Sequence, residues 1–253
     1  MKKILLFVLM TFFVQTAFCQ NLSDTVNVEY SKNSPRRLSL SVGPVASALA
    51  FNSLPNLNQF LKTQRIPTNN INDVSIYFPV GFSYQTKRIL LRYGLNISIA
   101  MSNNDRINNY STSLSMWNSN FSTGYAFFAD RNNFLYLNLG IGFGEYTKTI
   151  NKYDLQSISL ASALQNGVNQ SMVLKNTQGF IDIGVEFLKR SQGKRIGQCL
   201  RFGYRYGLKE TPWSSQFIRL SDVPSDRISS IYLESFLNIP HISRKNRNNP
   251  TNN

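Results

Sequence analysis

Charged side chains recur at every fourth position, 201, 205 and 209, in the stretch Ile196–Lys209, which reads IGQCLRFGYRYGLK. Successive side chains of a β-strand point to opposite faces, so the odd-numbered residues share one face. That face carries glycines, one thiol and three cations, Arg201, Arg205 and Lys209, whereas the other face is almost entirely apolar and aromatic. An ion path or a substrate site would need a polar inner face of this kind.

The same alternation places further charges on the polar faces of other segments. The predicted set of inward charges is Arg92, Asp182, Glu186, Arg201, Arg205, Lys209 and Glu234. These residues would either conduct an ion or bind a substrate, or fill a narrow interior as buried pairs. Buried charges are costly unless they are paired. A tight turn near 191–195 would place Asp182 opposite Arg205 and Glu186 opposite Arg201, so we predict a packed, charge-paired interior without a continuous aqueous pore.

The other reactive side chains do not form a catalytic pattern. His241 is the only histidine and follows the last predicted strand, at the end of the strands opposite Ser214 and Ser215. A serine–histidine site is therefore not expected. One histidine and one inward thiol, Cys199, are too few ligands for a metal. We predict no enzyme activity and no catalytic, cofactor-binding or metal site, with Cys199 as a small filler of the interior.

Two aromatic residues, Trp213 and Phe217, stand in a long polar connection between predicted strands. A loop aromatic can anchor a protein partner. It can equally belong to a packed plug beneath the loops. Both interpretations stay open at the level of sequence.

The elements that position these residues are eight alternating segments. They are 37–46, 74–85, 91–100, 113–129, 135–144, 180–188, 196–209 and 228–239. The connections alternate between long (47–73, 103–110, 149–170, 210–226) and short (86–88, 130–133, 191–195), and helices are expected at 55–62 and 155–164. Eight strands of this length with two unlike ends are typical of outer-membrane barrels. The predicted fold is all-β, an eight-stranded antiparallel up-and-down transmembrane β-barrel with four long outer loops and three short periplasmic turns.

The beginning of the chain predicts export. Lys2 and Lys3 precede a short apolar run, and Ala17–Cys19 forms a cleavage site, which predicts a signal peptide at 1–19. Ordinary cleavage is expected, and lipidation of Cys19 stays open. The predicted division continues with a disordered periplasmic lead at 20–36, a transmembrane barrel at 37–239 and a basic periplasmic tail at 240–253. No apolar run is long enough for a spanning helix.

The formal net charge of +14 would suit nucleic acid, but the cations gather neither on a helix nor in a nucleic-acid motif. They fall at strand ends on one side, where anionic lipid headgroups would attract them. Outer-membrane lipid is therefore the expected partner, together with a periplasmic or surface protein, and nucleic acid is not.

Several features resemble the outer-membrane β-barrels of Gram-negative bacteria. They are the signal peptide ending Phe18-Cys19-Gln20, the opening run Leu38-Ser39-Leu40-Ser41-Val42-Gly43-Pro44 and the repeated inward glycines. The chain is similar to OmpA/OmpX-like eight-stranded barrels, and in particular to the PorT-like barrel domain of Bacteroidota. It departs from the usual pattern because its last strand does not end in an aromatic residue.

These features together predict a non-enzymatic outer-membrane protein with a structural or envelope-interaction role through its surface loops. The PorT-like resemblance implies an alternative, an accessory component of a protein secretion apparatus. A small transport or enzymatic barrel is a third, less favoured class. The specific ligand, the partner and the oligomeric state are not readable from the sequence.

Overall fold

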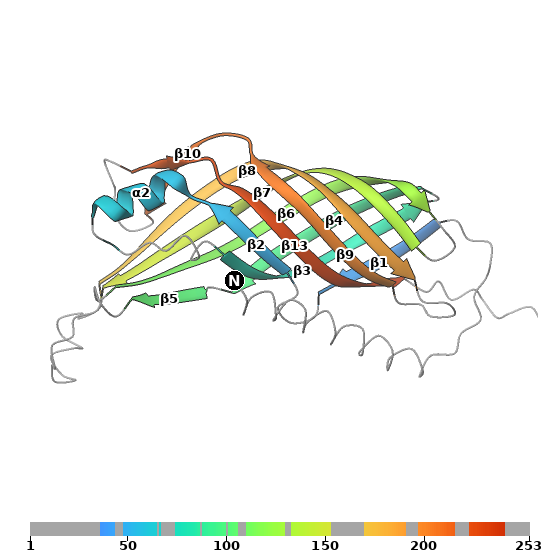
Figure 1. The fold of residues 1–253 in the computed structure, drawn as a ribbon, viewed down its shortest axis with the longest axis horizontal. Coiled ribbons are helices and arrows are strands. Elements are labelled where there is room, and N and C mark those ends of the chain that lie inside the picture. Colours follow the sequence, from blue (N-terminus) through green and yellow to red (C-terminus); the bar gives the residue numbers. More distant parts are fainter. Residues whose placement is uncertain are drawn as a thin grey trace, which may run out of the picture.

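The computed structural model describes residues 36–43, 48–64, 66, 74–86, 88–99, 101–105, 110–129, 133–152, 170–190, 197–215 and 223–240. The predicted signal peptide, residues 20–35 of the predicted lead, residues 241–253 of the predicted tail, the expected helix at 155–164 and Phe217 lie outside the described residues. The described chain is nearly all strand and forms one tilted barrel (Figure 1).

Antiparallel pairing closes the barrel. In chain order the strands are β1 (Arg36–Val42), β2 (Ala48–Ser53), β3 (Val74–Thr86), β4 (Ile89–Ile99), β5 (Met101–Asp105), β6 (Tyr110–Ala129), β7 (Asn133–Lys152), β8 (Gln170–Arg190), β9 (Gly197–Gly207) and β13 (Ser229–Pro240). β1 and β2 share the first position of the ring, and β5 continues β4 along β6. β13 pairs with β9 on one side and with β1 and β2 on the other, so the described strands occupy eight positions without an open edge. The predicted fold class is confirmed.

The predicted register between β8 and β9 is also confirmed. Asp182 is the Cα partner of Arg205, and Glu186 is the Cα partner of Arg201. A turn of fixed length sets the register of a hairpin, and slipping by one residue would turn every side chain to the wrong face. This register places Asp182, Glu186, Arg201 and Arg205 on the inward faces of the two strands.

Several strands are longer than the sequence indicated. The first strand position continues to Ser53, although a loop was expected from residue 47. β5 occupies part of the expected loop 103–110, so only residues 106–109 separate it from β6, and that connection is not long. β7 continues to Lys152 and β8 begins at Gln170, within the expected loop 149–170.

β7 was expected to end earlier because its apolar side chains change from the outer face to the inner face partway along the strand. On β7 the outward residues from Leu135 to Phe143 are apolar, but the next outward residues are Glu145, Thr147, Thr149 and Asn151. The inward residues change the opposite way, and Tyr146 and Ile150 are buried. After Phe143 the outer face of β7 is no longer apolar, but the strand continues to pair with its neighbours in the sheet. A strand predicted only from its outward apolar residues therefore ends before the strand in the structure does.

The expected helix at 55–62 is present as α2 (Pro55–Thr63). Proline stands in its first turn, where no N–H partner is lost, and Leu57 and Leu61 form its buried face. Three two-residue strands, β10 (Thr211–Pro212), β11 (Ser214–Ser215) and β12 (Ser225–Asp226), lie in the last connection. We call α2, β10, β11 and β12 the cap, because they lie at one end of the barrel (Figure 1). No helix in the described part of the chain is both long and apolar enough to span a membrane.

Candidate functional site

The outer surface of the barrel is a belt of exposed apolar side chains. Members from neighbouring strands include Phe82, Ile97, Phe121, Leu139, Ile183 and Phe202. On β7 the belt covers Leu135 to Phe143, a length that crosses the hydrocarbon layer of a bilayer as a tilted strand. Water would penalise such a surface, and the closed ring of paired strands leaves no open sheet edge among the described strands. The protein is an integral membrane β-barrel.

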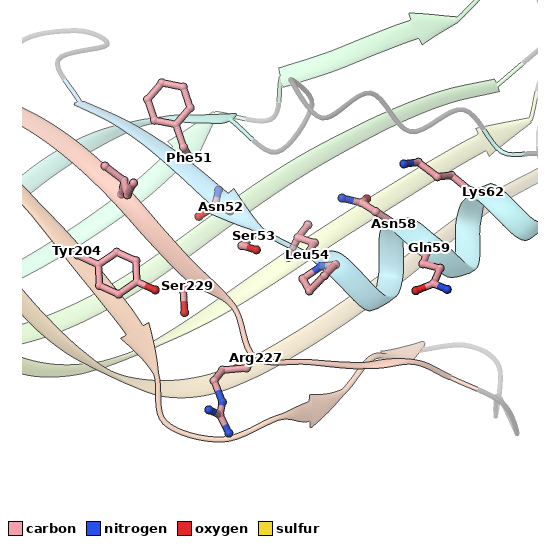
Figure 2. A pocket seen from close by; sticks show the side chains of 12 residues that line it. Phe51, Asn52, Ser53, Leu54, Asn58, Gln59, Lys62, Tyr204, Arg227 and Ser229 are labelled. Atoms are coloured by element: carbon pink, nitrogen blue, oxygen red, sulfur yellow. The ribbon is translucent and has the colours of Figure 1, made fainter.

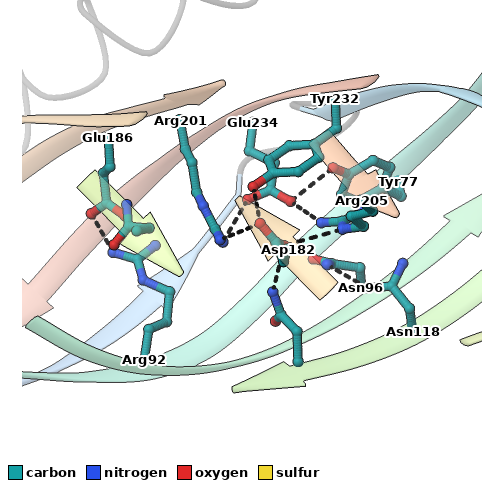
Figure 3. Close-up of polar contacts among 12 residues, drawn as sticks. Tyr77, Arg92, Asn96, Asn118, Asp182, Glu186, Arg201, Arg205, Tyr232 and Glu234 are labelled. Carbon is teal, nitrogen blue, oxygen red and sulfur yellow. Dashed lines mark hydrogen bonds and ion pairs between the residues drawn. The ribbon is translucent and has the colours of Figure 1, made fainter. Parts of the chain in front are cut away.

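The interior of the barrel contains a compact network of ion pairs. Arg205 lies 2.6 Å from Glu234 and 3.4 Å from Asp182, and Arg201 lies 3.0 Å from Asp182 and 3.6 Å from Glu234. Each arginine therefore contacts both carboxylates, and all four side chains are buried (Figure 3). Tyr232 donates a hydrogen bond to Asp182 at 2.6 Å, so a neutral group also contributes to the network.

A separate pair lies beside this network. Arg92 on β4 is 2.6 Å from Glu186 on β8, although these two strands are not neighbours in the ring. The guanidinium of Arg92 also lies over the ring of Phe236 at 4.2 Å. Glu186 thus faces Arg201 in register, but its ion pair crosses the interior to Arg92. Three cations and three carboxylates of the predicted set are brought together in this way.

The prediction for Lys209 was wrong. β9 ends at Gly207, and Lys209 follows in a bend where it is exposed. The alternation of the sequence continues for two residues beyond the point at which the strand stops pairing with β8, because Phe180 and Gly207 are its last partners. Lys209 therefore belongs to the end of the barrel that carries the cap.

Facing glycines make room for the tyrosine of the network. Gly184 and Gly203 are direct partners on β8 and β9. A Cβ atom on Gly203 would stand 2.6 Å from Cζ of Tyr232, and one on Gly184 would stand 2.9 Å from its hydroxyl. The absence of both side chains lets Tyr232 cross the interior and reach Asp182.

Apolar side chains fill the interior at the end with the short turns. The cluster comprises Leu90, Ala126, Phe134, Tyr136, Leu188, Cys199 and Phe236. Gln85 donates to the hydroxyl of Tyr136, and Arg190 donates to Gln85. Cys199 is buried in this cluster, where the sequence placed a small filler.

The cap fills the opposite end. The buried cluster there includes Leu54, which precedes α2, Leu57 and Leu61 from α2, Trp213 from the last connection, and Leu114, Tyr146 and Leu174 from the parts of β6, β7 and β8 beyond the belt. β11 pairs with β8 through Ser214 and Lys175, which joins the cap to the extended sheet. The interior is thus packed at both ends and charge-paired between them.

Asp226 connects the two parts of the cap. Its carboxylate accepts hydrogen bonds from the backbone N–H groups of Asn56 at 2.9 Å and Leu57 at 3.0 Å. These are two of the N–H groups that the first turn of a helix leaves without a partner. The indole of Trp213 donates to the same carboxylate at 2.8 Å. A carboxylate from a distant part of the chain therefore replaces the usual capping residue of α2.

Trp213 does not form an exposed partner anchor. Its exposed fraction is 1 %, and it packs among the leucines of α2. Of the two interpretations of this residue, the structure supports the packed plug. The residue that organises the plug, Asp226, was not singled out from the sequence, because nothing in its neighbourhood indicates a helix that begins about 170 residues earlier.

The site chemistry agrees with a structural interior. Asp182, Glu186 and Glu234 are all buried and engaged with arginines, which leaves none of these three in contact with solvent. Among the described residues, no group of three metal-ligating side chains comes together.

The chain matches no protein-family model and no curated protein sequence. Among solved structures it is similar to the attachment invasion locus protein Ail of Yersinia pestis, with 9% identity, a TM-score of 0.44 and coverage of 83% of this chain and 100% of that one. It is similar to a major outer membrane protein of Thermus thermophilus, with 9% identity, a TM-score of 0.47 and coverage of 81% and 99%. A third is the outer membrane protease OmpT of Escherichia coli, with 9% identity, a TM-score of 0.37 and coverage of 84% and 99%. Similarities of this size do not assign a function to the chain.

Proposed function

We propose that this protein is a non-enzymatic barrel that acts through its cap as an envelope-interaction protein at the cell surface. The observation that carries the proposal is the filled interior. A network of buried ion pairs lies between two apolar clusters, so packed and paired side chains occupy the described interior. Eight strands enclose a space that side chains can just fill. Function is therefore expected on the outer surfaces of the molecule.

The cap suits this role because it presents a fixed surface. Leu57 and Leu61 and the carboxylate of Asp226 hold α2 in place, and the opposite face of α2 is exposed. Gln59 lies on that face and Phe60 lies on the flank beside it, and the ring of Phe60 is not part of the buried cluster. A preorganised helix loses little conformational freedom when a partner binds.

A comparison of two variants tests the proposal. Photo-crosslinking in intact cells, with the reactive group at Gln59, would identify a protein or glycan that touches the cap. We expect the crosslink to disappear in Phe60→Ala and to persist when residues 241–253 are deleted. A control reactive group at exposed Arg88, at the other end of the barrel, should not give the same product.

The alternative is the accessory role in protein secretion that the PorT-like resemblance implies. It would act through the lead at 20–36 or the basic tail at 240–253. Loss of the crosslinked or co-purified partner on deletion of the tail, with no effect of Phe60→Ala, would favour this alternative and refute the cap proposal. Stepwise conductance of the purified protein in planar bilayers would instead show that it transports solutes.

A further inference from the structure

A groove lies on the outside of the barrel, between α2 and the outer face of β2, β13 and β9. It has a volume of about 720 Å³ and is open to the surroundings. The lining residues come from both the apolar belt and the cap (Figure 2). The groove thus lies at the boundary where the lipid-facing surface gives way to the polar end of the protein.

One wall of the groove is a row of apolar side chains on three neighbouring strands. Ile231 on β13 is the Cα partner of Phe51 on β2 and of Tyr204 on β9. Their exposed fractions are 48%, 48% and 43%, so all three point away from the barrel interior. The row is continuous with the belt and provides a surface for a hydrocarbon chain.

The wall changes from apolar to polar at the next outward-facing residue towards the cap. Ser229 and Ser53 are partners in the next outward position of β13 and β2. The groove also carries two exposed cations on opposite sides, Arg227 after β12 and Lys62 in the last turn of α2 (Figure 2). Arg227 is oriented by a hydrogen bond of 2.5 Å to the hydroxyl of Tyr206. No carboxylate is among the residues that line the groove.

We infer that this groove binds a phosphorylated lipid of the leaflet that meets the cap. One acyl chain lies along Phe51, Ile231 and Tyr204, the ester or hydroxyl region of the lipid meets the two serines, and the phosphate contacts Arg227, while Lys62 adds positive charge from the other side of the groove. The order of apolar, hydroxyl and cationic groups along the wall matches the order of parts in such a lipid. With the cap at the cell surface, as proposed above, the leaflet is the outer one.

Two features favour a lipid over a free phosphate or a protein segment. The groove combines cations with an apolar wall that belongs to the lipid-facing belt, so a lipid can place its acyl chain on the wall while its phosphate meets a cation. The cations have no acidic neighbour in the groove to neutralise them, and a guanidinium favours phosphate as a bidentate partner.

The test is native mass spectrometry of the folded protein in detergent, titrated with dioleoylphosphatidic acid. Dioleoylglycerol, which lacks only the phosphate, and inorganic phosphate serve as comparison ligands. We expect one tightly bound phosphatidic acid and much weaker binding of both comparison ligands. A juxtamembrane cation contributes about fivefold to the affinity for an anionic lipid, so Arg227→Gln with Lys62→Gln should weaken binding about thirtyfold.

Matched variants separate the site from general lipid attraction. Arg88 bears the same relation to Tyr125 at the other end of the barrel, with a hydrogen bond of 3.3 Å, and Arg88→Gln should leave the titration unchanged. Ile231→Ser should weaken binding, whereas Ile97→Ser, elsewhere in the belt, should not. Unchanged affinity in the double cation variant, an equal loss in Arg88→Gln or equal binding of dioleoylglycerol would each overturn the inference. Because this measurement does not depend on membrane orientation or on a protein partner, its failure is distinguishable from failure of the cap proposal.

Discussion

Removing the charge of Arg205 is the most direct perturbation of the interior. Arg205 is buried, lies 2.6 Å from Glu234 and 3.4 Å from Asp182, and covers the ring of Tyr232 at 4.2 Å. Arg205→Met keeps much of the volume but leaves one carboxylate in excess. Breaking a buried ion pair by removing one partner costs roughly 3–5 kcal/mol of unfolding free energy. For Arg205→Met we expect a loss of about 3 kcal/mol, the lower end of that range.

The lower end follows from the neighbours that remain. Arg201 still contacts both carboxylates, at 3.0 Å and 3.6 Å. Tyr77 donates to Glu234 at 2.8 Å, and Tyr232 donates to Asp182. These contacts screen part of the excess charge. Adding Glu234→Gln to Arg205→Met removes the excess carboxylate charge. The double variant should therefore regain about 2 kcal/mol of the lost unfolding free energy.

The assay is equilibrium unfolding by urea of protein folded in lipid vesicles, followed by tryptophan fluorescence, with the unfolding free energy from linear extrapolation. The control is the ion pair between Lys175 and Glu145, which is 3.2 Å long and has side chains 35% and 24% exposed. Lys175→Met should cost no more than about 1 kcal/mol, because water screens a half-exposed pair. Equal losses in Arg205→Met and Lys175→Met, or strictly additive losses in the cycle with Glu234, would refute the reasoning.

Four other outcomes are expected. Asp226→Ala should cost roughly 2 kcal/mol in the cap, because two helix N–H groups and an indole lose their acceptor, and limited trypsin digestion should then cut at Lys62. Gly203→Ala should lower the unfolding free energy by roughly 1–3 kcal/mol, because the added Cβ displaces Tyr232. Trypsin added to intact cells should cut at Lys152, on the cap side, and spare the connection 191–196. The folded protein in sodium dodecyl sulphate should migrate differently before and after boiling, as a closed barrel does.

Each of these outcomes has its own control. Asp226→Asn keeps one acceptor oxygen and should give slower digestion than Asp226→Ala; equal rates would contradict the proposed hydrogen bonds. Gly179→Ala should be mild, since its Cβ would meet only the end of Leu208 at 3.2 Å. Cleavage of intact cells within 191–196 would invert the membrane orientation. A circular dichroism spectrum dominated by helix would contradict the barrel itself.

The sequence by itself determined the barrel and the hairpin that carries its charges. Lipid outside and a narrow interior impose strict alternation, which is local and therefore visible in a stretch such as Gly197–Gly207. A tight turn fixed the register of Asp182 and Arg205 for the same reason, because it relates near neighbours in the chain. The helix α2 was also readable, since its proline and its two buried leucines stand at helical spacing.

Only the tertiary structure decided which groups meet across the barrel. The pair of Arg92 and Glu186 joins strands that are not neighbours, so no hairpin register predicts it. Asp226 caps a helix from the far end of the chain, and Trp213 is buried because that helix covers it. The inversion of the apolar face after Phe143 depends on where the membrane ends and the cap begins. These relations are set by the closure of the barrel, which brings together residues that are far apart in the sequence.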